Sequence, residues 1–116
     1  FQLPVQIHAC ATIRESDGLA MSSRNIRLTS EERKAAPILF KTLSSARKLV
    51  DEHGISNAIK LMTNQIDAFK DFQTEYLELV NPITLQPVQD IGPVGSSRVC
   101  VAVKTSRTRL IDNMAV

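Results

Sequence analysis

From residue 30 onward the apolar residues of this chain change their spacing once, near residue 73, and this change limits the folds available to it. Between residues 30 and 72 apolar residues recur three or four positions apart, which is the period of a helix buried along one side. After residue 72 they alternate, or run continuously over short segments, as is typical of strands. Helices and strands in separate blocks predict an α+β domain, here a helical pair packed on a small antiparallel sheet.

The first helix is predicted from about Ser30 to Glu52. Thr29 and Glu32 form a capping box at its start, in which each side chain can bond the other residue's backbone N–H. Pro37 lies inside the helical pattern and predicts a bend or a restart, because proline removes a backbone hydrogen bond. Gly54 is a good terminator, so the helix is expected to end near it.

The second helix is predicted from Ser56 to about Phe72, antiparallel to the first. Three strands are expected after it, over Tyr76–Val80, Arg98–Lys104 and Arg109–Asp112, with a hairpin turn between the last two. Arg98–Lys104 is apolar on both faces, which is typical of a central strand. A further strand is predicted over Val5–Thr12, ahead of the first helix.

Composition indicates a folded domain and excludes some classes of partner. The 116 residues are 43% hydrophobic and 22% charged, which is ordinary for a globular protein. The net charge of +2 is too balanced to indicate nucleic acid or an anionic membrane as a partner. No apolar run approaches the roughly 18 residues of a membrane span, so none is predicted.

Cysteines and histidines are few and scattered. Cys10 and Cys100 lie in strand-like apolar settings and permit one disulfide. Buried free thiols in a reducing, cytoplasmic setting are expected instead, because small disulfide-stapled folds carry more cysteines. His8 beside the first strand and His53 at a helix end are expected to be structural. No metal site is predicted, since these residues are too isolated to form one.

The polar segment before the first helix contains the residues best suited to chemistry, namely Ser22, Ser23 and Arg24. Hydroxyls, backbone N–H groups and a planar guanidinium all bind anionic oxygen, and together they suit the phosphates of a nucleotide. Gly18 allows the backbone to bend or to approach a ligand closely. Taken alone, a solvated loop before a capped helix is the commoner explanation of such a segment.

Other polar residues leave alternatives open. Asp17 either orients Arg24 or the loop backbone, or simply stabilises a turn. Arg107 and Arg109 either meet substrate phosphates or lie on a solvent-facing hairpin edge, the commoner situation. Asp112 is expected to bond locally and is assigned no catalytic role.

The segment from Arg14 to Leu28 resembles the pantothenate synthetase (pantoate–β-alanine ligase) family, whose loop reads R-(D/E)-x-D-G-L-A-(M/L)-S-S-R-N-x-Y-L. The likeness returns at Glu75–Pro82, Thr84–Val88 and Thr108–Asn113. It covers essentially the whole chain, but only the carboxy-terminal part of the family's sequence. One departure is Arg27, which stands where the family has tyrosine and either alters the packing under the loop or adds one positive charge near the phosphates.

The resemblance implies the carboxy-terminal lid domain of a Rossmann-type, class I nucleotidyltransferase-like enzyme. It divides the chain into residues 1–13, the last strand of an absent amino-terminal Rossmann-type domain, residues 14–28, an ATP-binding hinge loop similar to the KMSKS loop, and residues 29–116, the lid. The chain begins at Phe1 rather than Met, so it is expected to be a piece of a longer protein. Cut from its parent sheet, the first strand would expose unpaired backbone groups and pair with another chain.

The resemblance also implies a two-step ligase reaction. Pantoate and ATP give pantoyl adenylate and pyrophosphate, and β-alanine then displaces AMP to give pantothenate, with Mg²⁺ accompanying the nucleotide. The residues implied to contact ATP are Ile13, Met21, Ser22, Ser23 and Arg24, the last three also as catalytic groups. ATP, pantoate and β-alanine would be bound mainly by the absent amino-terminal domain, and the full-length enzyme is expected to be a cytoplasmic homodimer.

Two other classes of function stay open beside the ligase. One is a stand-alone nucleotide- or phosphate-binding module without catalysis, and the other is a structural dimerisation domain. The chain has no HIGH-like histidine pair and no Gly-rich phosphate loop between a strand and a helix. It is therefore expected to be inactive by itself.

Overall fold

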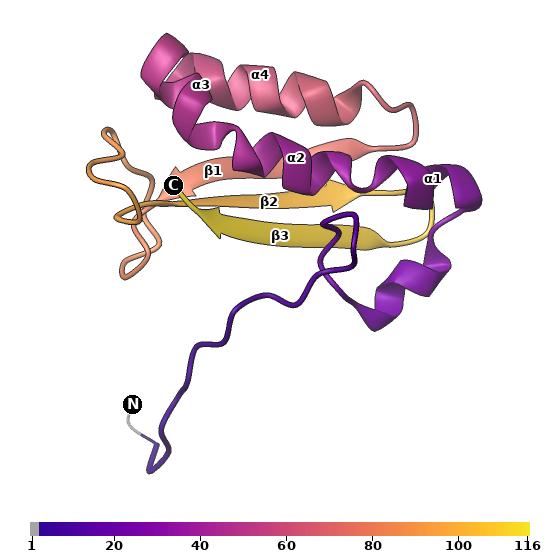
Figure 1. The fold of residues 1–116 in the computed structure, drawn as a ribbon, viewed down its shortest axis with the longest axis horizontal. Coiled ribbons are helices and arrows are strands. Elements are labelled where there is room, and N and C mark those ends of the chain that lie inside the picture. Colours follow the sequence, from indigo (N-terminus) through magenta and orange to yellow (C-terminus); the bar gives the residue numbers. More distant parts are fainter. Residues whose placement is uncertain (1–2) are drawn as a thin grey trace.

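Helices cover one face of a three-stranded antiparallel sheet in this computed structural model, which describes residues 3–116 (Figure 1). The α+β class, with its small antiparallel sheet after the helices, is as predicted. In chain order the elements are the 3₁₀-helix η1 (Ser23–Arg27), α1 (Ser30–Ala35), α2 (Ile38–Ser44), α3 (Ala46–His53), α4 (Ile55–Asp67), β1 (Gln73–Val80), β2 (Arg98–Lys104) and β3 (Arg109–Ala115).

The predicted first helix is interrupted twice. The break between α1 and α2 falls at Ala36 and Pro37, where the proline predicted it. The break at Ser45 was not predicted, and a single helix onward to Glu52 is wrong. There the N–H and the hydroxyl of Ser45 both donate to the Thr42 carbonyl, at 3.1 and 2.7 Å. A bond to the third residue back tightens the turn and changes the direction of the helix.

One further helix boundary differs from the sequence prediction. α4 ends at Asp67 rather than Phe72, and the following residues turn tightly, with the N–H of Phe69 donating to the Ile66 carbonyl at 3.3 Å. The Asp67 carboxylate accepts both the N–H and the hydroxyl of Thr74, each at 2.8 Å. This contact ties the helix end to the start of β1. α3 ends at His53 with Gly54 as its C-cap, close to the predicted stop. The φ of 79° at that glycine lets the chain turn directly into α4, which packs beside α3.

The sheet has the order β1-β2-β3, so the two-sided apolar strand is central as predicted. β1 begins earlier and β3 ends later than the sequence indicated. Leu77, Val101 and Asp112 lie opposite one another in register and face the helices. The core between the layers contains apolar residues from both, including Leu39, Leu43, Met62, Ile66, Leu79, Val99, Val103 and Leu110.

Residues 3–13 form no strand, so the prediction over Val5–Thr12 is wrong for this structure. A strand needs a neighbour to complete its backbone hydrogen bonds. Within the described chain this segment has no ladder partner, and every residue of it is exposed as it leaves the domain (Figure 1). Its assignment to an absent domain, and its pairing with another chain, stay predictions.

Both cysteines are free, as predicted, but the expected burial is wrong for Cys10. Cys10 is exposed and Cys100 is half-buried, and both are free thiols. Burial raises the pKa of the Cys100 thiol, so this group is held in its neutral form. Between residues 3 and 116, no helix has the length and apolar character needed to cross a bilayer.

Candidate functional site

Residues 13–21 form a closed loop, although their sequence has no regular period. The N–H of Met21 donates to the Ile13 carbonyl at 2.9 Å, and the N–H of Glu15 donates to the Leu19 carbonyl at 2.8 Å. The N–H of Gly18 returns to the Glu15 carbonyl at 2.9 Å. Leu19 is only 3% exposed and joins the hydrophobic core. Backbone pairing and one buried anchor therefore give this segment a defined shape.

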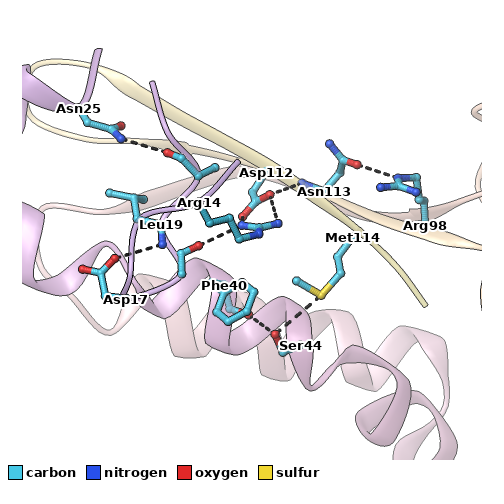
Figure 2. A network of polar contacts seen from close by, with 12 residues as sticks. Arg14, Asp17, Leu19, Asn25, Phe40, Ser44, Arg98, Asp112, Asn113 and Met114 are labelled. Atoms are coloured by element: carbon cyan, nitrogen blue, oxygen red, sulfur yellow. Dashed lines mark hydrogen bonds and ion pairs between the residues drawn. The ribbon is translucent and has the colours of Figure 1, made fainter. Parts of the chain in front are cut away.

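Arg14 is the central polar side chain of the loop (Figure 2). Its Nη1 and Nη2 donate to Oδ2 and Oδ1 of Asp112 at 2.6 and 2.9 Å, and Nη1 also donates to the Gly18 carbonyl at 3.0 Å. The guanidinium carbon lies 4.8 Å from the centre of the Phe40 ring. One side chain thus joins the loop to β3 and to α2.

Asp112 makes the predicted local bond, because its Oδ1 accepts the N–H of Asn113 at 2.8 Å. The sequence analysis missed its main partner, which is Arg14, far away in the sequence. A signal for this contact was present, because Asp112 occupies a core-facing position between Leu110 and Met114. A carboxylate there needs a buried partner. Which partner it finds depends on the fold.

Gly18 bends the loop and brings its backbone against an aromatic ring. Its φ is +94°, which L side chains rarely adopt, and a Cβ at this position would lie 2.3 Å from Cδ1 of Phe40. The sequence allowed Gly18 either to bend the backbone or to let it approach a ligand closely. The structure shows the bend, and the group that the backbone approaches closely is the Phe40 ring.

Asp17 stabilises the turn and does not contact Arg24. Its Oδ1 accepts the N–H of Leu19 at 3.2 Å, and its Oδ2 accepts Nη1 of Arg33 on α1 at 2.6 Å. The Arg33 hydrogen bond is the main reason that the pKa of Asp17 lies below its usual value. Asp17 therefore stabilises a turn and does not orient Arg24.

The second half of the segment presents most of its side chains to solvent, while Asn25 is half-buried. Ser22 caps η1 by accepting the N–H of Arg24 at 3.2 Å, and Asn25 donates to the Ala20 carbonyl at 3.0 Å. Ser22, Ser23 and Arg24 are all exposed. Among the contacts of residues 3–116, the Arg24 guanidinium has neither a hydrogen bond nor an ion pair.

A cleft of about 250 Å³ lies between this segment and β3. Its walls are Leu19, Ala20, Met21, Ser22, Arg24 and Asn25 on one side, and Leu39 with Arg109, Leu110, Ile111 and Asp112 on the other. The structure thus places Met21, Ser22 and Arg24 together around one opening. Ile13 is 67% exposed and is joined to Met21 by its carbonyl, while neither it nor Ser23 lines the cleft.

The hairpin arginines differ from each other. Arg109 lines the cleft, but its Nε donates to Glu75 at 3.1 Å and its guanidinium lies 5.9 Å from the Tyr76 ring centre. Arg107 sits in the turn, where its N–H bonds Thr105, and it does not line the cleft. Arg109 is therefore near the candidate site with its charge already paired.

The predicted capping box is confirmed, and it has a second use that the sequence did not reveal. Glu32 accepts the N–H of Thr29 at 3.0 Å, and its other oxygen accepts both the N–H and the hydroxyl of Ser106. The buried carboxylate thereby ties α1 to the β2–β3 turn. Burial raises the pKa of Glu32, but these donors outweigh it and the pKa lies below its usual value.

No group of three or more His, Cys, Asp or Glu residues within residues 3–116 is arranged to hold a metal ion. His53 lies at the end of α3, 3.7 Å from Glu52, and His8 lies in the exposed segment. Neither histidine is near the cleft walls.

Comparison with known proteins gives a consistent match. A family model described as pantoate-beta-alanine ligase matches residues 1–115. A pantothenate synthetase of Oleidesulfovibrio alaskensis is 44% identical over 119 aligned positions, which cover 98% of this chain and 41% of that protein. One from Thermus thermophilus is 39% identical, over 97% of this chain and 41% of that protein.

Solved structures agree with this match. The crystal structure of pantothenate synthetase from Thermus thermophilus superposes with a TM-score of 0.83 at 38% identity, covering 96% of this chain and 40% of that one. Pantoate-beta-alanine ligase from Francisella tularensis, solved with beta-gamma ATP and beta-alanine, gives a TM-score of 0.57 at 24% identity, over 91% of this chain and 31% of that one, and shows likeness of fold alone. The chain spans about two fifths of the length of the curated relatives it matches.

Proposed function

This chain belongs to the pantoate-beta-alanine ligase family, and from that premise we propose that its residues 14–28 are the nucleotide loop of an enzyme that joins pantoate and β-alanine with ATP. The chain is the family's carboxy-terminal domain. The remaining three fifths of such an enzyme would supply most of the substrate contacts.

The strongest support for this proposal is that some polar side chains of the loop are bonded inside the domain while others are free to bind a ligand. The polar groups of Arg14 and Asp17 are occupied by contacts inside the domain. Those of Ser23 and Arg24 point to solvent, and the Arg24 guanidinium has no counter-ion among the described residues. An unpaired guanidinium beside serine hydroxyls, at the mouth of a cleft, is available to phosphate oxygens.

In the proposed first step, a carboxylate oxygen of pantoate attacks the α-phosphorus of ATP. The bond from that phosphorus to the bridging oxygen breaks, and pyrophosphate leaves with the electron pair. Negative charge builds on the non-bridging and leaving oxygens, where Arg24 would donate charge-assisted hydrogen bonds. Ser23 would add its hydroxyl, and Ser22 can still donate its proton, because in the N-cap its oxygen acts as an acceptor. Ile13 and Met21 would flank the nucleotide.

In the proposed second step, the β-alanine amine attacks the acyl carbon and AMP leaves. A loop that covers the mixed anhydride would keep water from hydrolysing it. Mg²⁺ accompanying the nucleotide would neutralise part of the phosphate charge. No described residue group fits a dedicated metal site, so we assign none of these residues to the ion.

The decisive experiment is pantoate-dependent exchange between ATP and pyrophosphate in the full-length protein. Arg24→Ala is expected to lower the exchange rate about 100-fold, the scale for loss of one transition-state donor. Arg27→Ala is the matched control, since it removes the same charge from the other end of η1 and is expected to change the rate little. Equal effects of the two variants would show that general positive charge matters and the position of Arg24 does not.

The same assay separates the ligase from the other functions. A full-length protein that binds ATP without pantoate-dependent exchange would be a non-catalytic nucleotide-binding module, and one that does neither would fit a dimerisation domain. The isolated chain is expected to show no exchange, because the adenylation site would be incomplete. The homodimer and the cytoplasmic setting stay predictions.

A further inference from the structure

We propose that Asp112 and Arg14 are positioning residues for the nucleotide loop, and that their ion pair holds η1 so that Arg24 faces the cleft. This inference rests on the proposed function, because it concerns the place from which Arg24 would act. Neither residue needs to touch the nucleotide. The pair acts through the backbone that it holds.

The geometry of the pair fixes direction as well as distance. Two parallel hydrogen bonds, at 2.6 and 2.9 Å, join the guanidinium fork of Arg14 to both oxygens of Asp112. The Gly18 carbonyl takes a third bond, and the Phe40 ring lies 4.8 Å from the guanidinium carbon (Figure 2). Contacts to β3, to α2 and to the loop itself leave this side chain little freedom to rotate.

A continuous set of contacts leads from Arg14 to Arg24. Arg14 pairs with Ala20 in an isolated antiparallel bridge. The Ala20 carbonyl accepts the side-chain amide of Asn25 at 3.0 Å, and Asn25 follows Arg24 in η1. A displacement of Arg14 would therefore displace Ala20. Because Asn25 in η1 bonds the Ala20 carbonyl, η1 would be displaced as well. Asp112 also lines the cleft that Arg24 lines, so the pair is anchored in the opposite wall.

The choice of a charged residue at position 112 indicates a role in geometry. The Asp112 side chain is 3% exposed and lies on the core-facing side of β3, where an apolar residue would pack without the cost of desolvation. Replacing buried ion pairs by apolar residues is often neutral or stabilising, so stability alone does not explain the carboxylate. A bidentate pair sets an orientation that apolar packing does not.

The test is a double-mutant cycle in the full-length protein, with Asp112→Asn and Arg24→Ala. The asparagine keeps the shape of the side chain and removes its charge and one acceptor oxygen. We expect Asp112→Asn to lower kcat for pantoate-dependent ATP–pyrophosphate exchange about tenfold, as for loss of a hydrogen bond to a charged group. In the Arg24→Ala background it should lower kcat no further, because there is no guanidinium left to position. The melting temperature should fall equally in both backgrounds.

Each outcome of the cycle decides one point. An equal fold-loss of kcat from Asp112→Asn in both backgrounds, or no loss in either, overturns the positioning role and leaves the proposed function intact. Unchanged exchange in Arg24→Ala alone overturns the role proposed for Arg24 and the positioning role with it. Absence of exchange in the unmodified full-length protein overturns the proposed function. Asp51→Asn is the matched control, because this carboxylate also pairs with an arginine, Arg47 at 3.4 Å, but is 59% exposed. It should leave kcat unchanged both with and without Arg24.

A second variant keeps the proposal testable if Asp112→Asn does not fold. Arg14→Lys retains the positive charge but lacks the planar fork, so it cannot reproduce both bonds to Asp112. The same dependence on Arg24 is expected: a fall in kcat when Arg24 is present and none when it is absent. A lysine variant with the exchange rate of the unmodified protein would show that charge suffices, and would overturn the role given to the fork.

Discussion

The two halves of the segment from residue 14 to residue 27 have similar polar content and opposite uses. In residues 14–20, Arg14 and Asp17 donate to or accept from groups within the domain, and Leu19 is buried. In residues 21–27, Ser23, Arg24 and Arg27 point to solvent. The first half therefore behaves as part of the folded domain, and the second half as a surface that the domain presents.

This difference teaches how a short polar loop can be both rigid and available. Polar groups with internal partners have a fixed geometry, but they are no longer free to bind a ligand. Groups without such partners are free, but need a rigid neighbour to hold them in place. Arg14 and Arg24 are the same residue type in one loop, and only their surroundings assign one to structure and the other to binding.

The largest expected effect comes from a substitution at Gly18, in the half of the loop that is bonded to the domain (residues 14–20). Gly18→Ala is expected to lower the free energy of unfolding by about 2–4 kcal/mol, because it combines overpacking with a left-handed backbone conformation. The clash would be with Phe40, since the added Cβ lies 2.3 Å from that ring. Urea unfolding of the full-length protein would measure it.

Gly95→Ala is the control for this prediction. Gly95 has a similar φ of +87°, but a Cβ there would have nothing within 4 Å, so only the backbone cost of about 1–2 kcal/mol applies. Equal losses of unfolding free energy in the two variants would mean that the contact with Phe40 does not restrict residues 14–20.

An intermediate effect is expected for Glu32, which holds α1 to the β2–β3 turn. Its pKa is lowered in the folded state, so its stabilising contribution is complete above the unfolded value of about 4.3 and is lost as the pH falls through the lower, folded value. The hydrogen-exchange protection of the Ser106 amide should therefore decrease in that acidic window.

Glu32→Gln provides the comparison for this pH dependence. The variant should lower the protection of the Ser106 amide about tenfold at neutral pH, as for loss of a hydrogen bond to a charged group. It should also remove the acid dependence, because glutamine does not titrate. Retention of the same acid-induced loss in the variant would assign the effect to another carboxyl group.

The smallest expected effect concerns the exposed contact between Arg33 and Asp17. Both side chains are more than a third exposed, at 36% and 38%, so solvent screens their attraction. Arg33→Ala should lower the free energy of unfolding by less than about 1 kcal/mol, and by less still in high salt. Asp17 keeps its bond to the Leu19 N–H in this variant. A loss that salt does not reduce would show that Arg33 contributes by packing.

Much of the fold could be read from local signals in the sequence. The capping box at Thr29, the break at Pro37 and the stop at Gly54 depend on residues within one helical turn. The central place of Arg98–Lys104 follows from its two apolar faces, because both sides of that strand must be covered. For the candidate site, the motif around Ser22 and Arg24 named the residues, and their roles toward ATP stay predictions.

Only the tertiary structure decided which residues meet across the fold. Thr74 at the start of β1 bonds Asp67 at the end of α4, and the stretch at residues 5–12 forms no strand without a neighbouring strand. The pairing of Arg14 with Asp112 depends on the register of β3 against the loop, which no pattern within either segment specifies. Local periodicity sets which side of an element is buried. Partners distant in sequence are set by how the elements pack, and here that packing separates the anchoring arginine from the exposed one.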